Sequence, residues 1–133
     1  MNVTVTRTIK ATPEQVYEVW LDPKSPGGPW FSARPPIIDI KVDGLFYHVS
    51  DSKGRQFPHF GRFVALERGK HIEYTWMSPA TRGLETTVTL DLRAVSGGTE
   101  LVLVHTGLHD DDVADHDRGW SFIADCVVKR IER

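Results

Sequence analysis

The fold of this chain is decided by its C-terminal stretch, residues 111–131, which read DDVADHDRGWSFIADCVVKRI. Apolar side chains recur there at intervals of three, four or seven positions: Val113, Trp120, Ala124, Val127 and Ile131. This spacing is typical of one face of an α-helix. At 1.5 Å per residue the helix would be roughly 30 Å long, enough to cover a sheet. Because Gly119 disfavours a helix, we expect it to mark close packing on another element.

The middle of the chain has the pattern of an antiparallel sheet. Turn signals such as Asp43-Gly44, Lys53-Gly54 and Gly97-Gly98 separate short runs suited to strands. Six strands are predicted, over residues 37–42, 45–50, 57–67, 71–77, 85–94 and 100–106. Their connections are too short for crossover helices, so neighbouring strands must run antiparallel. Both faces of the last strand are apolar, which leaves its orientation open.

Two short elements precede this sheet. Residues 3–9 alternate β-branched apolar side chains with polar ones and predict a further strand. Thr12 follows as a helix N-cap, with Pro13 at the first helical position and Gln15 placed to complete a capping box. The pair at 22–23, Asp-Pro, ends this short helix.

Residues 24–36 are rich in proline and glycine, so we expect an irregular, lid-like segment there. Trp30 and Phe31 lie inside it. Exposing two adjacent large aromatic side chains would cost several kcal/mol of apolar transfer energy, so both are expected to pack inward.

Composition limits what the chain can be. Its 133 residues suit a single domain over 1–133 with one hydrophobic core. A net charge of −2, with scattered lysines and arginines, argues against a nucleic-acid partner. No run of about 18 apolar residues could span a membrane, and the N-terminus lacks the features of a signal peptide. Cys126 is the single cysteine and cannot form an internal disulfide, so we expect a cytoplasmic protein.

Several short motifs together resemble a known family. They are residues 11–17 (ATPEQVY), 30–31 (WF), 74–76 (YTW), 88–90 (VTL), 105–108 (HTGL) and 119–120 (GW). In order and spacing they resemble the activator of heat-shock-protein-90 ATPase homologue group, within the START-related (SRPBCC) superfamily. The resemblance implies an α+β helix-grip fold, in which a curved antiparallel sheet wraps around a long C-terminal helix and leaves an internal apolar cavity. It supplies no universal catalytic set.

One departure from the family concerns the entrance to that cavity. The family often has a second short helix before its tryptophan, and residues 25–29, Ser-Pro-Gly-Gly-Pro, make that helix doubtful here. The doorway is therefore expected where residues 26–31 replace a regular helix.

Aromatic and histidine side chains are the candidate ligand-binding residues. The predicted set is Trp30, Phe46, His48, Phe60, Tyr74, Trp76, His105 and Trp120. The aromatic bulk could line a cavity or fill the interior solidly, and we favour a cavity because a curved sheet gripping a helix leaves space near one helix end. His48, His59 or His105 could act as an acid or base if it faces that cavity, and His105 is the best placed of them. The alternative, that His105 is a satisfied core histidine, is favoured over an acid–base role.

An acidic cluster at the start of the helix is the other candidate site. His109, Asp112 and His116 would lie near one another on a helix. Carboxylates also cap free amide groups at a helix N-terminus and favour its positive dipole end. Since no metal motif such as H-E-x-x-H is present, we expect no metal site and no cofactor.

Three functional hypotheses follow. The first is a binding module for a small hydrophobic or aromatic molecule. The second is a co-chaperone-like interaction domain with a chaperone partner and a role in the stress response, which the family resemblance implies. The third is a cavity enzyme that uses a histidine as acid or base. The sequence also leaves a homodimer open.

Overall fold

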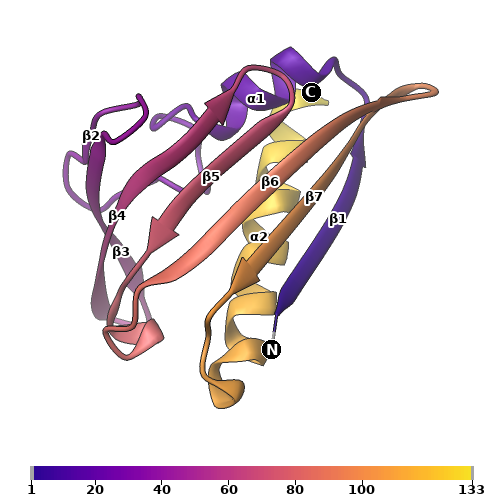
Figure 1. Ribbon diagram of the computed structural model, residues 1–133. Helices are drawn as coiled ribbons and strands as arrows, with labels where there is room; N and C mark the ends of the chain where they lie inside the picture. Colours follow the sequence, from indigo (N-terminus) through magenta and orange to yellow (C-terminus); the bar gives the residue numbers. More distant parts are fainter. Residues whose placement is uncertain (1, 133) are drawn as a thin grey trace.

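A computed structural model describes residues 2–132 (Figure 1). The elements are, in chain order, β1 (Val3–Ile9), α1 (Pro13–Trp20), β2 (Ile37–Ile38), β3 (Leu45–Ser52), β4 (Arg55–Glu67), β5 (His71–Trp76), β6 (Thr86–Val95), β7 (Gly98–Thr106) and α2 (Val113–Ile131). Two short 3₁₀ turns, η1 (Pro79–Thr81) and η2 (Asp110–Asp112), precede β6 and α2 respectively.

The strands form one curved antiparallel sheet in the order β1-β7-β6-β5-β4-β3-β2. The first strand therefore pairs with the last one, and α2 runs along the sheet and packs on β1 (Figure 1). This is the predicted α+β helix-grip fold, which is confirmed. Among residues 2–132, no helix is long and apolar enough to cross a membrane.

The predicted strands are present, with one large difference in length. The strand expected over 37–42 is limited to Ile37–Ile38, because the chain turns immediately afterwards. Within that turn the Lys41 amide donates to the Asp39 carbonyl, and Asp43 takes a positive φ of 67°. A strand cannot continue through such a turn.

The start of α1 is built as its sequence predicts. Thr12 Oγ1 accepts a hydrogen bond from the Gln15 amide (3.2 Å), and Gln15 Oε1 accepts one from the Thr12 amide (3.0 Å). This reciprocal pair satisfies two amide groups that the first helical turn leaves free. The helix buries Val16 and Trp20 in the core.

Alternation along β7 resolves the orientation that its sequence leaves open. Leu101, Leu103 and His105 are fully buried, whereas Val102 and Val104 are half-buried on the opposite face. The inner face of β7 points toward α2, which buries Trp120 and other apolar residues of its stripe. The core therefore lies between the sheet and one face of α2.

Trp30 is the centre of a packed aromatic cluster under one half of the sheet. Its ring lies 4.8 Å from that of Phe46, 5.0 Å from Tyr74 and 5.5 Å from Phe63, measured between centroids. Its indole nitrogen donates to the Trp20 carbonyl at 2.9 Å, which fixes the loop to the end of α1. A pocket lies beside this cluster, toward the N-terminal part of α2.

Candidate functional site

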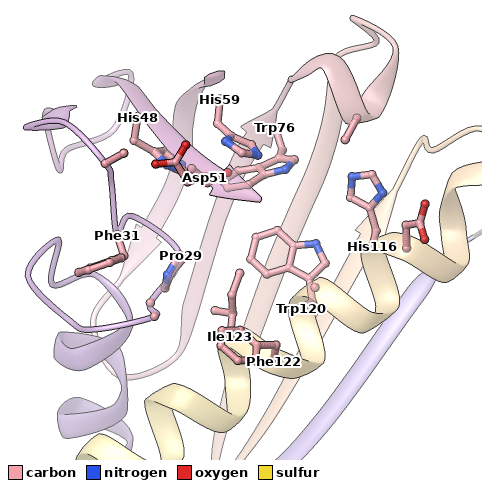
Figure 2. Close-up of a pocket in the computed structure, with 17 residues that line it drawn as sticks. Pro29, Phe31, His48, Asp51, His59, Trp76, His116, Trp120, Phe122 and Ile123 are labelled. Atoms are coloured by element: carbon pink, nitrogen blue, oxygen red, sulfur yellow. The ribbon is translucent and has the colours of Figure 1, made fainter. Parts of the chain in front are cut away.

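A pocket of about 560 Å³ lies between the N-terminal part of α2 and the β3–β4 hairpin (Figure 2). Its wall is formed by side chains from four parts of the chain: Gly27, Gly28, Pro29, Phe31, Ala33, His48, Ser50, Asp51, His59, Trp76, Ala80, Asp115, His116, Gly119, Trp120, Phe122 and Ile123. Aromatic and aliphatic side chains form most of the wall. The acidic side chains are Asp51 and Asp115, and no lysine or arginine is among these residues.

The helix α2 supplies one wall of the pocket. Trp120 and Ile123 face the interior, and His116 stands one turn before Trp120 (Figure 2). Gly119 lies between them in the helix, and a Cβ added there would meet no atom within 4 Å. The expectation that Gly119 marks close packing is therefore wrong: the residue leaves open space at the pocket wall.

The proline-rich loop supplies a second wall at the predicted doorway. Residues 22–31 form successive turns and no helix, as the Ser25 and Gly28 amides each donate to the carbonyl three residues earlier. Gly27 has a φ of 71°, and a Cβ there would meet Cys126 Sγ at 2.6 Å. Glycine thus allows the loop to lie directly on α2.

Phe31 corrects another expectation about this loop. Trp30 is fully buried, but Phe31 is 53% exposed and stands at the pocket rim (Figure 2). The burial of Trp30 in the core therefore does not bring its neighbour inward.

His48 and His59 stand opposite each other on the third wall. They are direct cross-strand partners in β3 and β4. Their rings stack with centroids 4.8 Å apart and planes within 9°. Trp76 from β5 packs beside them, at 4.7 Å from His59 and 5.4 Å from His48. Two histidines and a tryptophan thus form one continuous wall (Figure 2).

Neither ring is charged in this environment. Burial lowers the pKa of His48 to about 3, with a smaller contribution from the neighbouring His59. Burial also lowers the pKa of His59 to about 4; the Phe57 carbonyl offsets part of that shift, and His116 adds to it. Both imidazoles are therefore neutral at pH 7.

Three of the four nitrogen atoms of these rings lack a hydrogen-bond partner of normal geometry within residues 2–132. His48 Nδ1 and Nε2 are buried, and neither forms a hydrogen bond within the described chain. His59 Nδ1 likewise forms none of normal geometry, although the Phe57 carbonyl approaches the ring. A buried donor or acceptor left unpaired costs about 1–3 kcal/mol. Such an arrangement is unusual for a residue whose role is packing alone.

His105 presents the opposite case. Its Nδ1 accepts a hydrogen bond from the Trp120 indole nitrogen at 2.9 Å, so the ring proton lies on Nε2. Nε2 then donates to Thr86 Oγ1 at 2.7 Å, and the Thr86 hydroxyl donates to the Trp76 carbonyl. Burial, together with the nearby His116, lowers the pKa of His105 to about 3. Both nitrogens are occupied, so His105 is a satisfied core histidine.

With this geometry in view, the chain was compared with known proteins. The sequence profile described as Activator of Hsp90 ATPase homolog 1-like protein matches residues 10–130. The chain belongs to this family. No curated protein sequence matches the chain.

Solved structures of similar proteins share the fold across the whole length. Protein MLL2253 from Mesorhizobium loti superposes with a TM-score of 0.82 at 22% identity, covering 100% of this chain and 98% of that one. Protein CV1439 from Chromobacterium violaceum gives 0.81 at 23% identity, with 100% and 99% covered. CalU16 from Micromonospora echinospora gives 0.78 at 20% identity, with 98% and 75% covered. At these identities the likeness establishes the fold alone.

The predicted ligand-binding residues of this Activator of Hsp90 ATPase homolog 1-like chain divide into three groups. His48, Trp76 and Trp120 line the pocket. Trp30, Phe46, Tyr74 and His105 are buried in the packed core beside it.

Phe60 forms the third group by itself, on the outer face of the sheet. Its side chain is 41% exposed and packs on Tyr47, with ring centroids 5.1 Å apart.

The Tyr74 hydroxyl is also without a hydrogen bond of normal geometry. It lies near the indole nitrogen of Trp20, which is unpaired as well. Burial raises the pKa of Tyr74, and the neighbouring Trp20 opposes this more weakly. The Tyr74 phenol is outside the pocket wall and so is not available to a ligand there.

The predicted ligand-binding set leaves out His59, Phe31 and Ile123, which also line the pocket. For His59 a usable signal was in the sequence. A two-residue turn at Lys53-Gly54 places opposite each other any two residues whose numbers sum to 107, and His48 and His59 are such a pair.

The acidic cluster before α2 has structural partners. Asp112 Oδ2 accepts from Arg82 Nε at 2.7 Å, and His116 Nδ1 donates to the Asp112 carbonyl at 2.9 Å. His109 Nδ1 accepts from the Asp111 amide at 3.2 Å. Within residues 2–132 no three metal-ligating side chains gather as a metal site would need.

Proposed function

We propose that this chain binds a small hydrophobic or aromatic molecule in the pocket between α2 and the β3–β4 hairpin. The observation that carries this function is the pocket itself, about 560 Å³ in volume and walled by Trp76, Trp120 and Phe31. Ligand pockets typically measure about 300–1,000 Å³ and are mostly apolar with a few polar groups. Both conditions are met.

The fold supports the same function. Helix-grip domains of this family commonly bind hydrophobic ligands. The aromatic core around Trp30 anchors the loop that forms the doorway. The pocket wall is therefore built on rigid elements, which reduces the entropy cost of binding.

A direct test uses 2-methylnaphthalene as an apolar probe in isothermal titration calorimetry. The wild-type chain is expected to bind it, and Gly119→Leu is expected to weaken the affinity at least tenfold. The reason is that the space beside Gly119 is empty, so a leucine there would occupy the pocket.

The matched control is Ala114→Leu, which adds bulk at an exposed position of the same helix outside the pocket. It should leave the affinity within about twofold of wild type, because it touches no part of the wall. If the wild-type chain binds neither 2-methylnaphthalene nor its hydroxylated counterpart 2-naphthol, or if Gly119→Leu binds the probe equally well, the proposed function is refuted.

The two other functional hypotheses, a cavity enzyme and a co-chaperone-like domain, have less structural support. Acid–base catalysis by His105 is disfavoured because both ring nitrogens are engaged. A chaperone partner and a homodimer stay predictions.

A further inference from the structure

The polar part of the pocket is concentrated at the His48–His59 wall. The two rings stack at 4.8 Å and are surrounded by aromatic side chains, with Trp76 and Trp30 at 5.4 and 5.8 Å from His48. His48 is only 3% exposed, yet it lines the pocket. Its ring is thus presented to the pocket and to little else.

A neutral imidazole carries one N–H donor and one nitrogen acceptor, whichever tautomer is present. In the described chain neither nitrogen of His48 has a hydrogen-bond partner. Buried side-chain polar atoms nearly always have one, from protein, water or ligand. Because His48 lines the pocket, a ligand in the pocket is the partner considered for these buried nitrogens.

The charges at the pocket wall limit what that group can be. Asp51 and Asp115 are the charged lining residues, and both are acidic. Asp115 is paired with Arg118, which is not a lining residue, so an anionic group would still meet Asp51 with no lysine or arginine among the lining residues to offset it. A cationic group would be attracted by the carboxylates, but it has no acceptor and would leave the N–H donor of a neutral imidazole unpaired.

A hydroxyl fits these conditions, because it is neutral and can both donate and accept a hydrogen bond. We infer that the pocket takes a hydroxylated aromatic molecule, such as a phenol or a naphthol, whose hydroxyl bonds to the ring nitrogens at the His48–His59 wall. This inference rests on the proposed function and names the chemical class of its ligand. The ring system of the ligand lies against Trp76 and Trp120.

The test compares probes of equal shape. 2-Naphthol and 2-methylnaphthalene differ by a hydroxyl in place of a methyl group, and 2-naphthoate carries an anion at the same position. Titration calorimetry at pH 7 should give 2-naphthol about fivefold to tenfold tighter binding than 2-methylnaphthalene, the value of one neutral hydrogen bond. 2-Naphthoate should bind more weakly than 2-naphthol.

Variants assign the effect to His48. In His48→Leu the preference for 2-naphthol over 2-methylnaphthalene should fall below about twofold, because the side chain keeps its bulk and loses both nitrogens. The matched control is His71→Leu, which changes a histidine that bonds to Asp91 and Glu73 away from the pocket. It should retain the wild-type preference.

The outcomes separate the two proposals. If 2-methylnaphthalene and 2-naphthol bind equally well to the wild-type chain, the pocket stands and the hydroxyl inference fails. Tighter binding of 2-naphthoate, or a preference that survives in His48→Leu, would also overturn it. If no probe binds, the proposed function fails and this inference with it.

Discussion

Two buried histidines of this chain share almost every property except their partners. His105 is 0% exposed and His48 is 3% exposed, and burial lowers the pKa of each to about 3. Both nitrogens of His105 are hydrogen-bonded, whereas neither nitrogen of His48 is. Burial and a shifted pKa therefore do not distinguish these two residues. The number of unpaired nitrogen atoms within residues 2–132 does, and it is the reason that we propose His48 as a ligand-binding residue.

The difference follows from the position of each residue under the sheet. His105 lies on β7, next to β6, where the indole of Trp120 from α2 reaches it. His48 lies on β3, across the pocket from α2 (Figure 2). The indole of α2 therefore reaches His105, whereas His48 lies at the wall of the pocket.

Acid should produce the largest effect, because His48, His59 and His105 are all neutral when folded. Each has a folded pKa of about 3 or 4, below the value of 6.5 in an unfolded chain. The contribution of these neutral histidines to the free energy of unfolding is complete above pH 6.5. It is lost as the pH falls from there toward their folded pKa values. Between pH 7 and pH 5 we expect a loss of about 2 kcal/mol of unfolding free energy for each histidine.

Urea unfolding at a series of pH values measures this slope. His105→Leu and His48→Leu should each reduce it by about the contribution of one histidine. His71 acts in the opposite direction: although burial lowers its pKa, hydrogen bonds to Asp91 and Glu73 outweigh this and raise it. A stability that is flat between pH 7 and pH 5 would show that the buried rings are not held neutral.

The next largest effect is the contrast between His105→Leu and His48→Leu at pH 7. Replacing His105 leaves the indole N–H of Trp120 buried without an acceptor and should cost about 2 kcal/mol. Replacing His48 removes two unpaired nitrogen atoms and should leave stability unchanged or raise it by about 1 kcal/mol. Chemical denaturation of both variants measures the difference. Equal losses would mean that His48 has partners in solution that its pairing within the chain does not show.

Gly119→Ala should give the smallest effect, and a favourable one. A methyl group there meets no atom within 4 Å, and alanine is the better helix former by about 1 kcal/mol. Its neighbour Trp120 should keep its bond to His105, so the melting temperature should rise by a few degrees. Thermal unfolding monitored by circular dichroism tests this. A destabilised variant would show that other atoms pack too closely against residue 119 to admit a methyl group.

Local patterns predicted much of the fold correctly. The capping box at Thr12 and Gln15, the strand 3–9 and the antiparallel pairing of consecutive strands all follow from interactions between residues near in sequence. The pairing of β1 with β7 joins distant parts of the chain and was not predicted. The helix is likewise correct, although it begins at Val113 after a 3₁₀ turn and not at 111. These features depend on spacing and capping, which a sequence displays directly.

The candidate site was predictable only in part. His48, Trp76 and Trp120 were in the predicted set and line the pocket, whereas Phe60, from the same set, points to the outer face. The aromatic character of a residue indicates that its side chain packs on other side chains. It does not indicate on which face of a curved sheet the side chain lies. The bulge where β4 pairs with β5 shifts the register between Phe63 and Ala65, and this shift is invisible in composition.

The sequence by itself determined that a long amphipathic helix would cover an antiparallel sheet, because hydrophobic periodicity and turn residues act locally. Only the tertiary structure decided which strands of the sheet the helix packs on. That choice depends on sheet curvature and on where Trp30 anchors the loop, both of which are set by contacts between distant residues. It gave His105 its two partners and left His48 facing a pocket.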